Sequence, residues 1–320
     1  RFKCDWSSDV CSSDLIGNNL AFGRYASVLS HYLAPPSGSV ASDEAARNMG
    51  NELARDIERE GIVMLENNGT LPLSKSIDKV NVFGHGCIDW YYMSSGSEKV
   101  ELNGLTYYDF LGALEHYGLE YNQELPTFYK KWHKAEGDTD TVNSDYDEFY
   151  QVREPGLEDN DEYQQIFENS KSFSNTALMV ISRHAGENSD CPHYQNKVEG
   201  QPRDDTRTYL QISTEEEYTL RKLAAEFENV IVVINSTNAM QLDFLQEIEG
   251  IDACISVGAT GVQGALSIPE ILYGDASPSG HLTDTYPYKH EYNITYYRAN
   301  SFHTRYYVDA PADCTTKGHR

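Results

Sequence analysis

The amino-acid sequence predicts an α/β fold: a flavodoxin-like three-layer sandwich with a mainly parallel sheet of about five strands. Two observations predict it. Short apolar runs that end in turn residues recur along the chain, and segments with helical spacing separate them. The clearest run, Ala-Leu-Met-Val-Ile at residues 177–181, has no polar interruption, which is typical of a strand covered on both faces.

The first expected element is a helix that begins near Ser42 and ends at Gly61. The Ser42 hydroxyl can accept a hydrogen bond from an amide of the first turn, and glycine commonly ends helices. Leu53, Ile57 and Met64 recur at roughly helical spacing, so we expect them to form the buried stripe of this helix.

The remaining elements alternate between strand and helix. After a short extended piece at 62–65, strands are expected at 79–84, 119–125, 177–181, 229–235 and 251–257. Helices are expected at 105–117, 162–170, 213–227, 240–248 and 262–273. Ser213 and Glu216 have the spacing of a capping box, which marks the start of the third of these helices.

The expected α/β domain covers residues 46–289. Within it, residues 134–169 are acidic and poor in aliphatic side chains, which indicates a surface insertion. Residues 1–15 look like a translated sequencing adapter rather than evolved protein sequence, so no fold is expected of them. Residues 16–45 are expected to form an N-terminal flank and residues 290–320 an irregular, truncated tail. We therefore expect the chain to be a fragment.

The composition narrows the set of partners. A formal net charge of −25 argues against nucleic acid and anionic membrane surfaces, and no apolar run approaches the ~18 residues of a membrane span. The six cysteines show no CxxC pair and no Cys/His metal spacing, so we expect no metal, no cofactor and no disulfide framework. Cys87 and Cys254 lie in or beside expected strands and are expected to be buried thiols. The sequence does not indicate the cellular compartment of the protein.

The loop after the strand at 177–181 holds the sharpest candidate for chemistry. In open α/β sheets, ligands bind at the carboxyl ends of strands. Glu187 follows the flexible Gly186 in this loop, with Arg183, His184 and Asp190 nearby. A lone glutamate in a polar loop is usually a solvated surface charge, but this residue set is also the one that an acid/base catalyst needs.

Three other loops are weaker candidates. Residues 84–86, Gly-His-Gly, lack the third glycine of a dinucleotide fingerprint. The glycines of residues 258–264 can serve either an anion or sugar hydroxyl at a helix N-terminus, or close packing of the helix on the sheet. Ser95, Gly96 and Ser97 belong to either a ligand loop or a surface turn. No G-x-S-x-G nucleophile elbow follows any expected strand.

Five separated segments together resemble one known family, the C-terminal α/β domain of glycoside hydrolase family 3, which contains β-glucosidases and related exo-acting glycosidases. They occur in the order of that family's motifs. The segments are ARDIEREGIVMLENNGTLPL at 54–73, VNVFG at 80–84, SRHAGENSD at 182–190, VIVVIN at 230–235 and LYGDASPSG at 272–280.

This resemblance implies a retaining glycosidase with two carboxylates on different domains. An aspartate on a (β/α)8 barrel attacks the anomeric carbon, and a glutamate of the α/β domain, matched here by Glu187, protonates the leaving oxygen. The implied substrate is a β-linked glucoside or oligosaccharide. Its expected contacts are Arg183, Gly186, Asp190, Ser95, Gly96 and Ser97.

The attacking aspartate is expected outside this chain, because a barrel of ~250 residues does not fit beside the α/β domain. Residues 22–33 resemble the leader that occurs when the α/β domain comes first, which favours a barrel beyond Arg320.

Departures from the family pattern keep two other hypotheses open. Asn188 stands where the family has glycine, Cys191 where it often has arginine, and His281 where lysine is common. The changes at Asn188 and Cys191 weaken the motif around Glu187 and favour a non-catalytic carbohydrate-binding or interaction module on the same fold. The third hypothesis is a nucleotide-binding flavodoxin-like domain.

Overall fold

The computed structural model describes most of the α/β domain. The chain divides into two compact units, 1–52 and 53–320. The described part of the first unit is the beginning of helix α3 (Asp43–Gly61) and the residue before it. The described residues are 42–93, 105–135, 150–186, 191–197, 204–283, 285, 286 and 289.

A six-stranded sheet forms the centre of the second unit, and its order is β1-β8-β7-β4-β2-β3. Strand β1 pairs antiparallel with β8, and every other pairing in this sheet is parallel. The predicted α/β fold with a mainly parallel sheet is therefore confirmed, with the extended piece after α3 as a sixth strand. The strands are β1 (Val63–Asn67), β2 (Lys79–Phe83), β3 (Glu120–Tyr121), β4 (Thr176–Arg183), β7 (Asn229–Ser236) and β8 (Ala253–Ser256).

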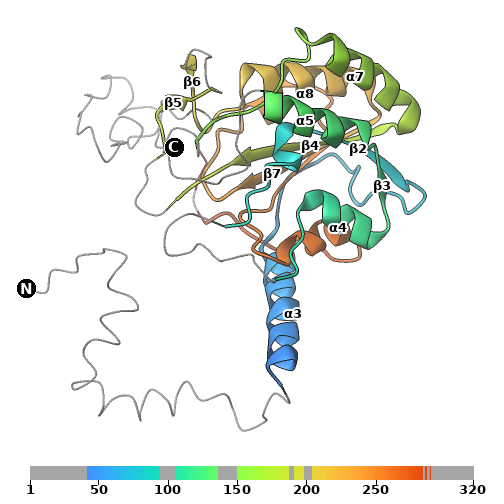
Figure 1. Ribbon diagram of the computed structural model, residues 1–320, viewed down its shortest axis with the longest axis vertical. Coiled ribbons are helices and arrows are strands. Elements are labelled where there is room, and N and C mark those ends of the chain that lie inside the picture. The colour runs from blue at the N-terminus through green and yellow to red at the C-terminus, as the bar shows by residue number, and fades with distance from the viewer. Residues whose placement is uncertain are drawn as a thin grey trace, which may run out of the picture. The chain divides into compact units, whose positions relative to one another are not determined.

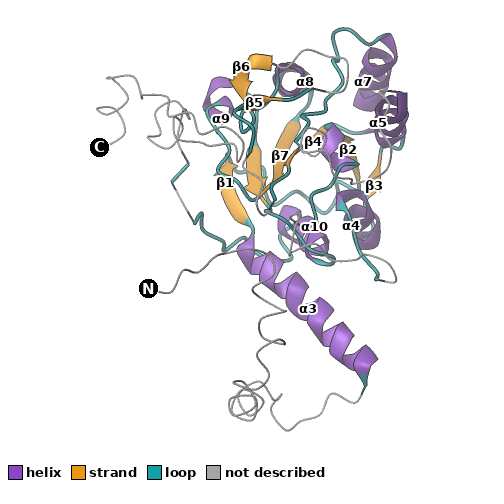
Figure 2. Cartoon of the chain, turned by 60° about the vertical axis from the view of Figure 1, so that its left-hand side comes forward, coloured by secondary structure: helices purple, strands orange, loops and turns teal. Residues whose placement is uncertain are grey.

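Helices cover both faces of this sheet (Figure 1). One face carries α5 (Glu124–Ala135), α7 (Asp161–Phe173) and α8 (Thr214–Glu226). The other carries α4 (Phe110–Tyr117) and α10 (Ser267–Leu272), and the second view of the chain in Figure 2 shows the same division. The shorter elements are η1 (His85–Cys87), α9 (Phe244–Glu247), η3 (Gly264–Leu266) and a separate antiparallel pair, β5 (Tyr194–Gln195) with β6 (Asp204–Thr208).

The two central strands carry the core. All eight residues of β4 pair with β7, from Thr176 opposite Asn229 to Arg183 opposite Ser236. Their side chains are almost all buried because helices lie on both faces, which explains the continuous apolar runs in the sequence. On the next strand, the Phe83 ring lies 5.7–5.8 Å from aromatic rings of the helical layer.

One predicted strand is much shorter than the sequence indicates. The run at 119–125 forms only the two-residue β3, and α5 begins three residues later. The cause is Asn122, whose side-chain oxygen accepts the backbone N–H of Glu124 at 3.0 Å while its amide donates to Asn81. This local turn ends the strand and starts α5, a helix that the sequence pattern does not predict.

The expected buried stripe of the first helix is wrong. Leu53 and Ile57 are 59% and 63% exposed. The opposite side of α3 is held by polar contacts instead: Arg55 and Arg59 both form ion pairs with Glu270 of α10. Two arginines that each donate to one oxygen of the same carboxylate can therefore hold a helix whose apolar residues face outward.

The acidic segment at 134–169 is not a surface insertion throughout. Tyr150, Val152 and Leu157 are almost fully buried. Tyr163 and Phe167 of α7, which confirms the helix expected at 162–170, also belong to the core. Acidic residues dominate the composition here, but widely spaced aromatic residues supply the buried contacts.

Two helices expected near the end of the domain are shorter than the sequence indicates. The helix expected at 240–248 is reduced to α9, and the helix expected at 262–273 is divided into η3 and α10. The capping box at Ser213 and Glu216 is confirmed, with both of its hydrogen bonds formed. Cys87 and Cys254 are free, buried thiols, as predicted.

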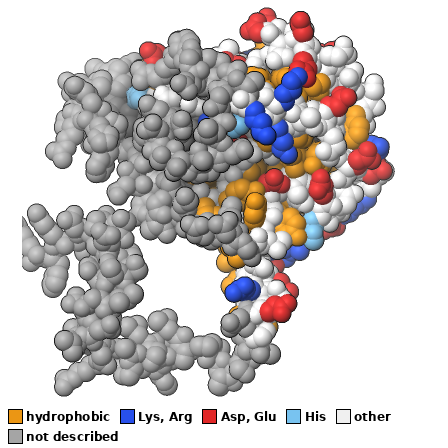
Figure 3. Space-filling view, viewed as in Figure 1, with side chains coloured by type: hydrophobic (Ala, Val, Ile, Leu, Met, Phe, Trp, Pro, Cys, Tyr) orange, Lys and Arg blue, Asp and Glu red, His pale blue; other side chains and the backbone are white. Residues whose placement is uncertain are grey.

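The described surface mixes charges of both signs. Figure 3 shows basic and acidic side chains interspersed over the helices of this face. Ion pairs join neighbouring helices: Lys131 of α5 contacts Glu162 of α7, and Lys171 of α7 contacts Glu226 of α8. Each exposed pair contributes about 0–1 kcal/mol to stability. Among the described residues, no helix combines the length and apolar character needed to cross a membrane.

Candidate active site

The candidate loop starts where the sequence places it, at the carboxyl end of β4. Strands β2, β7 and β8 run parallel to β4, so they end at the same edge of the sheet. The structure describes the first residues of this loop, up to the partly buried Gly186, and then residues 191–197. Five of the predicted site residues lie outside the described residues: Glu187, Asp190, Ser95, Gly96 and Ser97.

Arg183, the last residue of β4, has a structural environment. Its side chain is 2% exposed, and both of its terminal nitrogens bind the Glu216 carboxylate, at 2.8 and 2.6 Å. The remaining N–H groups donate to backbone carbonyls of Ser182, Tyr209 and Gln211 at 2.8–2.9 Å. A guanidinium has five N–H donors, so all of them have acceptors within the domain. This geometry does not support the predicted substrate contact of Arg183.

The charge of Arg183 is stabilised in place. Burial works to lower the pKa of its guanidinium, but the paired Glu216 carboxylate outweighs burial and the pKa lies above its usual value. Glu216 also closes the capping box of α8 by accepting the backbone N–H of Ser213 at 2.6 Å. The end of β4 is thus bound to the start of a helix that follows more than thirty residues later.

Asn235 joins the ends of three strands. It is fully buried near the end of β7, and its amide donates to the carbonyls of Tyr91 and Gly258 at 3.0 and 2.6 Å. Its side-chain oxygen accepts the backbone N–H of Tyr91 at 2.7 Å and the Ser182 hydroxyl at 3.2 Å. The segments after β2 and β8 are therefore held against the end of β4.

Gly84 and Gly86 allow the segment after β2 to lie close to the backbone of β4. Gly84 has φ +90°, and a Cβ there would lie 2.2 Å from the Val180 carbonyl oxygen of β4. A Cβ on Gly86 would lie 3.0 Å from Ser182. Only glycine fits against the neighbouring backbone at Gly84. Packing of the turn on β4 accounts for this motif, and it favours no nucleotide site.

Charged and aromatic side chains gather beside the start of the candidate loop. One Asp89 carboxylate oxygen lies 3.6 Å from Nε2 of His184, and the other lies 4.0 Å from both His85 and Arg153. Partial burial works to raise the pKa of Asp89, but the neighbouring histidines and Arg153 outweigh it, so the pKa lies below its usual value. Burial lowers the pKa of His85 to about 3, so its ring is neutral at physiological pH. It shares a 2.9 Å hydrogen bond with His133.

The glycine-rich loop at 258–264 is filled by packing contacts. The Thr260 hydroxyl accepts from the Trp90 indole at 2.9 Å, and the Gln263 amide donates to the Thr106 carbonyl at 2.6 Å. At Gly264, a Cβ would lie 2.8 Å from the side chain of Glu58 on α3. These contacts support the packing interpretation of the loop rather than an open anion site.

Glu58 is a poorly solvated carboxyl group near this edge of the sheet. Within the described part of the chain it has no hydrogen bond or ion pair, and burial raises its pKa to about 8 from the ordinary 4.5. Between these two pH values the folded state binds more protons than the unfolded chain. The contribution of Glu58 therefore makes the free energy of unfolding fall as the pH rises from 4.5 to about 8.

We expect Glu58→Gln to flatten this pH dependence. The wild-type slope attributable to Glu58 is at most about 1.4 kcal/mol per pH unit, and the neutral glutamine removes it. Urea unfolding at pH 5, 6.5 and 8.5 measures the difference. Glu60→Gln, at an exposed position of the same helix, is the matched control and should retain the wild-type slope. Equal slopes in the two variants would contradict the assignment.

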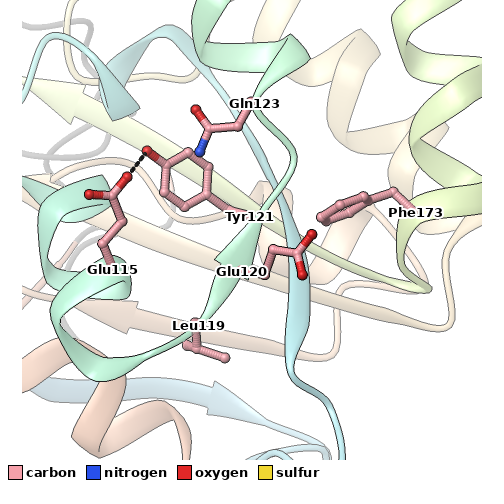
Figure 4. A pocket seen from close by; sticks show the side chains of 6 residues that line it. All are labelled: Glu115, Leu119, Glu120, Tyr121, Gln123 and Phe173. Atoms are coloured by element: carbon pink, nitrogen blue, oxygen red, sulfur yellow. Dashed lines mark hydrogen bonds between the residues drawn. The ribbon is translucent and has the colours of Figure 1, made fainter.

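A cavity of about 430 Å³ lies elsewhere, at the β3 edge of the sheet (Figure 4). Its two carboxylates already have partners: Glu115 accepts from the Tyr121 hydroxyl at 2.7 Å, and Glu120 pairs with Lys79 at 2.9 Å. No residue of the loop that follows β4 lines this cavity among the described residues, so it is not the candidate site. Among the described residues, no group of three or more His, Cys, Asp or Glu side chains could hold a metal ion.

The fold and the strand-end loop define the class of protein. The sequence model described as "Glycosyl hydrolase family 3 C-terminal domain" matches residues 62–313, which is most of the chain. The chain belongs to glycosyl hydrolase family 3, and the described α/β sheet is part of that family's C-terminal domain.

Relatives that the chain resembles in sequence are named as β-glucosidases. The chain is 29% identical over 274 residues to a β-glucosidase of Ruminococcus albus, covering 84% of this chain and 26% of the relative. It is 24% identical to β-glucosidase A of Butyrivibrio fibrisolvens, covering 78% and 30%. The chain thus spans about a quarter to a third of the length of these relatives.

Solved structures show the same fold. A β-glucosidase from Paenibacillus barengoltzii is 26% identical, with a TM-score of 0.62 over 75% of this chain and 24% of that protein. β-Glucosidase 3B from Thermotoga neapolitana, in complex with glucose, is 23% identical, with a TM-score of 0.59 over 76% of this chain and 31% of that protein.

Proposed function

We propose that this chain supplies the acid/base half of a retaining, exo-acting β-glycosidase of the β-glucosidase type. The observation that carries the proposal is the position of Glu187. In the sequence, Glu187 follows the last residue of β4 by four positions, within the segment that resembles the family's acid/base motif. Strand β4 itself ends at the carboxyl edge of the parallel part of the sheet, where ligands bind in open α/β folds. Membership in glycosyl hydrolase family 3 supports the same reaction class.

The proposed chemistry needs two carboxyl groups. Glu187 donates a proton to the leaving oxygen while a carboxylate about 5–5.5 Å away attacks the anomeric carbon. Glu187 then removes a proton from water, which hydrolyses the covalent glycosyl-enzyme. Its pKa must be raised so that it is protonated near neutral pH, and closure over the sugar supplies the required desolvation.

The attacking carboxylate is proposed to come from a (β/α)8 barrel of the same polypeptide. The length comparison supports this, because the chain spans only a quarter to a third of its β-glucosidase relatives. Gly186, Asp190 and the loop at 95–97 are proposed to contact a β-linked glucoside or oligosaccharide. The nucleophile itself is not assigned to this chain.

We expect the purified chain alone to show no measurable turnover of an aryl β-glucoside, because it holds one of the two carboxylates. The same chain joined to its barrel should hydrolyse that substrate. Release of 4-nitrophenol from the two proteins measures the difference. Turnover by the chain alone, or none with a barrel whose aspartate is intact, would contradict the proposal. Tight glucoside binding by the chain alone would instead favour the carbohydrate-binding module.

A further inference from the structure

Two buried tyrosine hydroxyls hold the backbone of the loop that follows β4. The Tyr209 hydroxyl donates to the carbonyl oxygen of His184 at 3.0 Å. The Tyr91 hydroxyl donates to the carbonyl oxygen of Ala185, the next residue, at 3.2 Å. Tyr91 is 2% exposed and Tyr209 is 1% exposed. Two successive peptide groups are thus fixed immediately before Gly186 and Glu187.

Each tyrosine is itself anchored to a different part of the sheet. The Tyr209 carbonyl accepts the Arg183 Nε–H at 2.9 Å, so this residue holds two consecutive positions of the chain. The Tyr91 backbone forms two hydrogen bonds with the buried Asn235 side chain of β7. The hydroxyls therefore act from fixed points rather than from mobile surface groups.

The His184 side chain also contacts Tyr91, and it lies close to Asp89. Its ring centroid lies 5.2 Å from that of Tyr91, and Asp89 lies 3.6 Å from its Nε2. His184 therefore has both its carbonyl group and its ring in contact with described residues. Asp89 and Tyr91 follow β2 in the sequence, whereas Tyr209 follows β6, so two separate segments of the chain contact His184.

We propose that Tyr91 and Tyr209 are positioning residues for the acid/base at Glu187. Their hydroxyls set the direction in which the chain leaves residue 185, two residues before the carboxylate. This inference rests on the proposed function of Glu187. Tyrosine and phenylalanine fill the same space, so the hydroxyls are not required for packing and satisfy these two carbonyls specifically. A displacement of about 1 Å at a reacting group costs ~10²-fold in rate.

The first test uses the chain alone and does not depend on catalysis. Hydrogen exchange of peptides covering residues 182–190 is measured for Tyr91→Phe, Tyr209→Phe and the double variant. We expect exchange to be ~3- to 10-fold faster, as the loss of a hydrogen bond predicts. Tyr121→Phe is the matched control, because it removes a tyrosine hydroxyl bond to Glu115 at the β3 edge. Unchanged exchange in this segment would overturn the proposal.

The second test uses the barrel-containing enzyme. For both phenylalanine variants, kcat/KM should fall ~10²-fold for a glucoside with a poor leaving group and much less for an activated one. Tyr121→Phe should retain wild-type values with both substrates. In a Glu187→Gln background, the tyrosine changes should cause no further loss with the poor leaving group, because the group that they position is gone.

The outcomes separate the two proposals. Equal losses for both leaving groups, or losses that add to that of Glu187→Gln, would assign Tyr91 and Tyr209 a purely structural role and overturn the inference. If Glu187→Gln itself shows no leaving-group preference, the proposed function fails and the positioning role fails with it. Faster exchange in the first test would then still show that the hydroxyls hold the loop.

Discussion

Replacing Glu216 with alanine is expected to lower the free energy of unfolding by about 3–5 kcal/mol. The change leaves the Arg183 guanidinium without its counter-ion. Because the Arg183 side chain is only 2% exposed, water cannot compensate for the loss. It also removes the acceptor for the Ser213 backbone N–H, and with it half of the capping box of α8. Both consequences act on the end of β4, which precedes the candidate loop.

Urea unfolding of Glu216→Ala and Glu217→Ala measures this effect with a neighbouring control. Glu217 also pairs with arginines, Arg207 and Arg221, but these pairs are partly exposed. Its loss should cost about 1 kcal/mol or less. Equal losses in the two variants would contradict a buried structural ion pair at Arg183.

Glu187→Gln in the barrel-containing enzyme is expected to produce the largest effect on catalysis. Proton donation contributes ~10²–10⁴-fold to rate, so hydrolysis of glucosides with poor leaving groups should fall by that amount. An activated leaving group such as 2,4-dinitrophenolate departs without a proton, so kcat/KM for its glucoside, which reports the step that releases it, should change little. A series of aryl and alkyl β-glucosides of increasing leaving-group pKa measures the difference.

Glu228→Gln is the control for this series. Glu228 is exposed and precedes β7, at the opposite edge of the sheet from the candidate loop. We expect wild-type rates for every leaving group. A uniform loss across the series in Glu187→Gln would argue against the acid role, because loss of an acid must affect poor leaving groups most.

The central strands could be predicted from the sequence because their apolar runs are continuous. Burial on both faces leaves no polar residue within 177–181, and the run at 229–235 differs only at its ends. The short β3 could not be predicted in the same way. A single side chain, Asn122, turns the chain into α5 through a local hydrogen bond, and this overrides the apolar pattern around it.

The prediction of the buried face of α3 was wrong for a different reason. Helical spacing indicates that Leu53 and Ile57 share a face, but it does not indicate which face is covered. In the structure that face is exposed, and arginine–glutamate pairs hold the other side. Glu270, which receives both arginines, lies more than two hundred residues away in sequence. Such long-range ion pairs leave no periodic signal.

The position of the candidate site was easier to predict than its supporting residues. A strand that ends in a loop with glycine and glutamate is visible in the sequence, and the described part of this loop lies at the carboxyl edge of the sheet. The role of Arg183 depends on Glu216, and those of Tyr91 and Tyr209 depend on carbonyl groups after β4. Only the tertiary structure brings these groups together, although Asn235, a polar residue at the end of an apolar run, offered a signal.

The central claim, that Glu187 is the acid/base, is tested most directly by the response of Glu187→Ala to azide in the barrel-containing enzyme. With 2,4-dinitrophenyl β-glucoside as substrate, the glycosyl-enzyme should form without acid assistance and accumulate, because no base activates water. Azide needs no base and fits the space left by the removed side chain. The account predicts that azide accelerates turnover and yields a glucosyl azide of retained β configuration. A folded Glu187→Ala variant whose rate and products are unaffected by azide would contradict it.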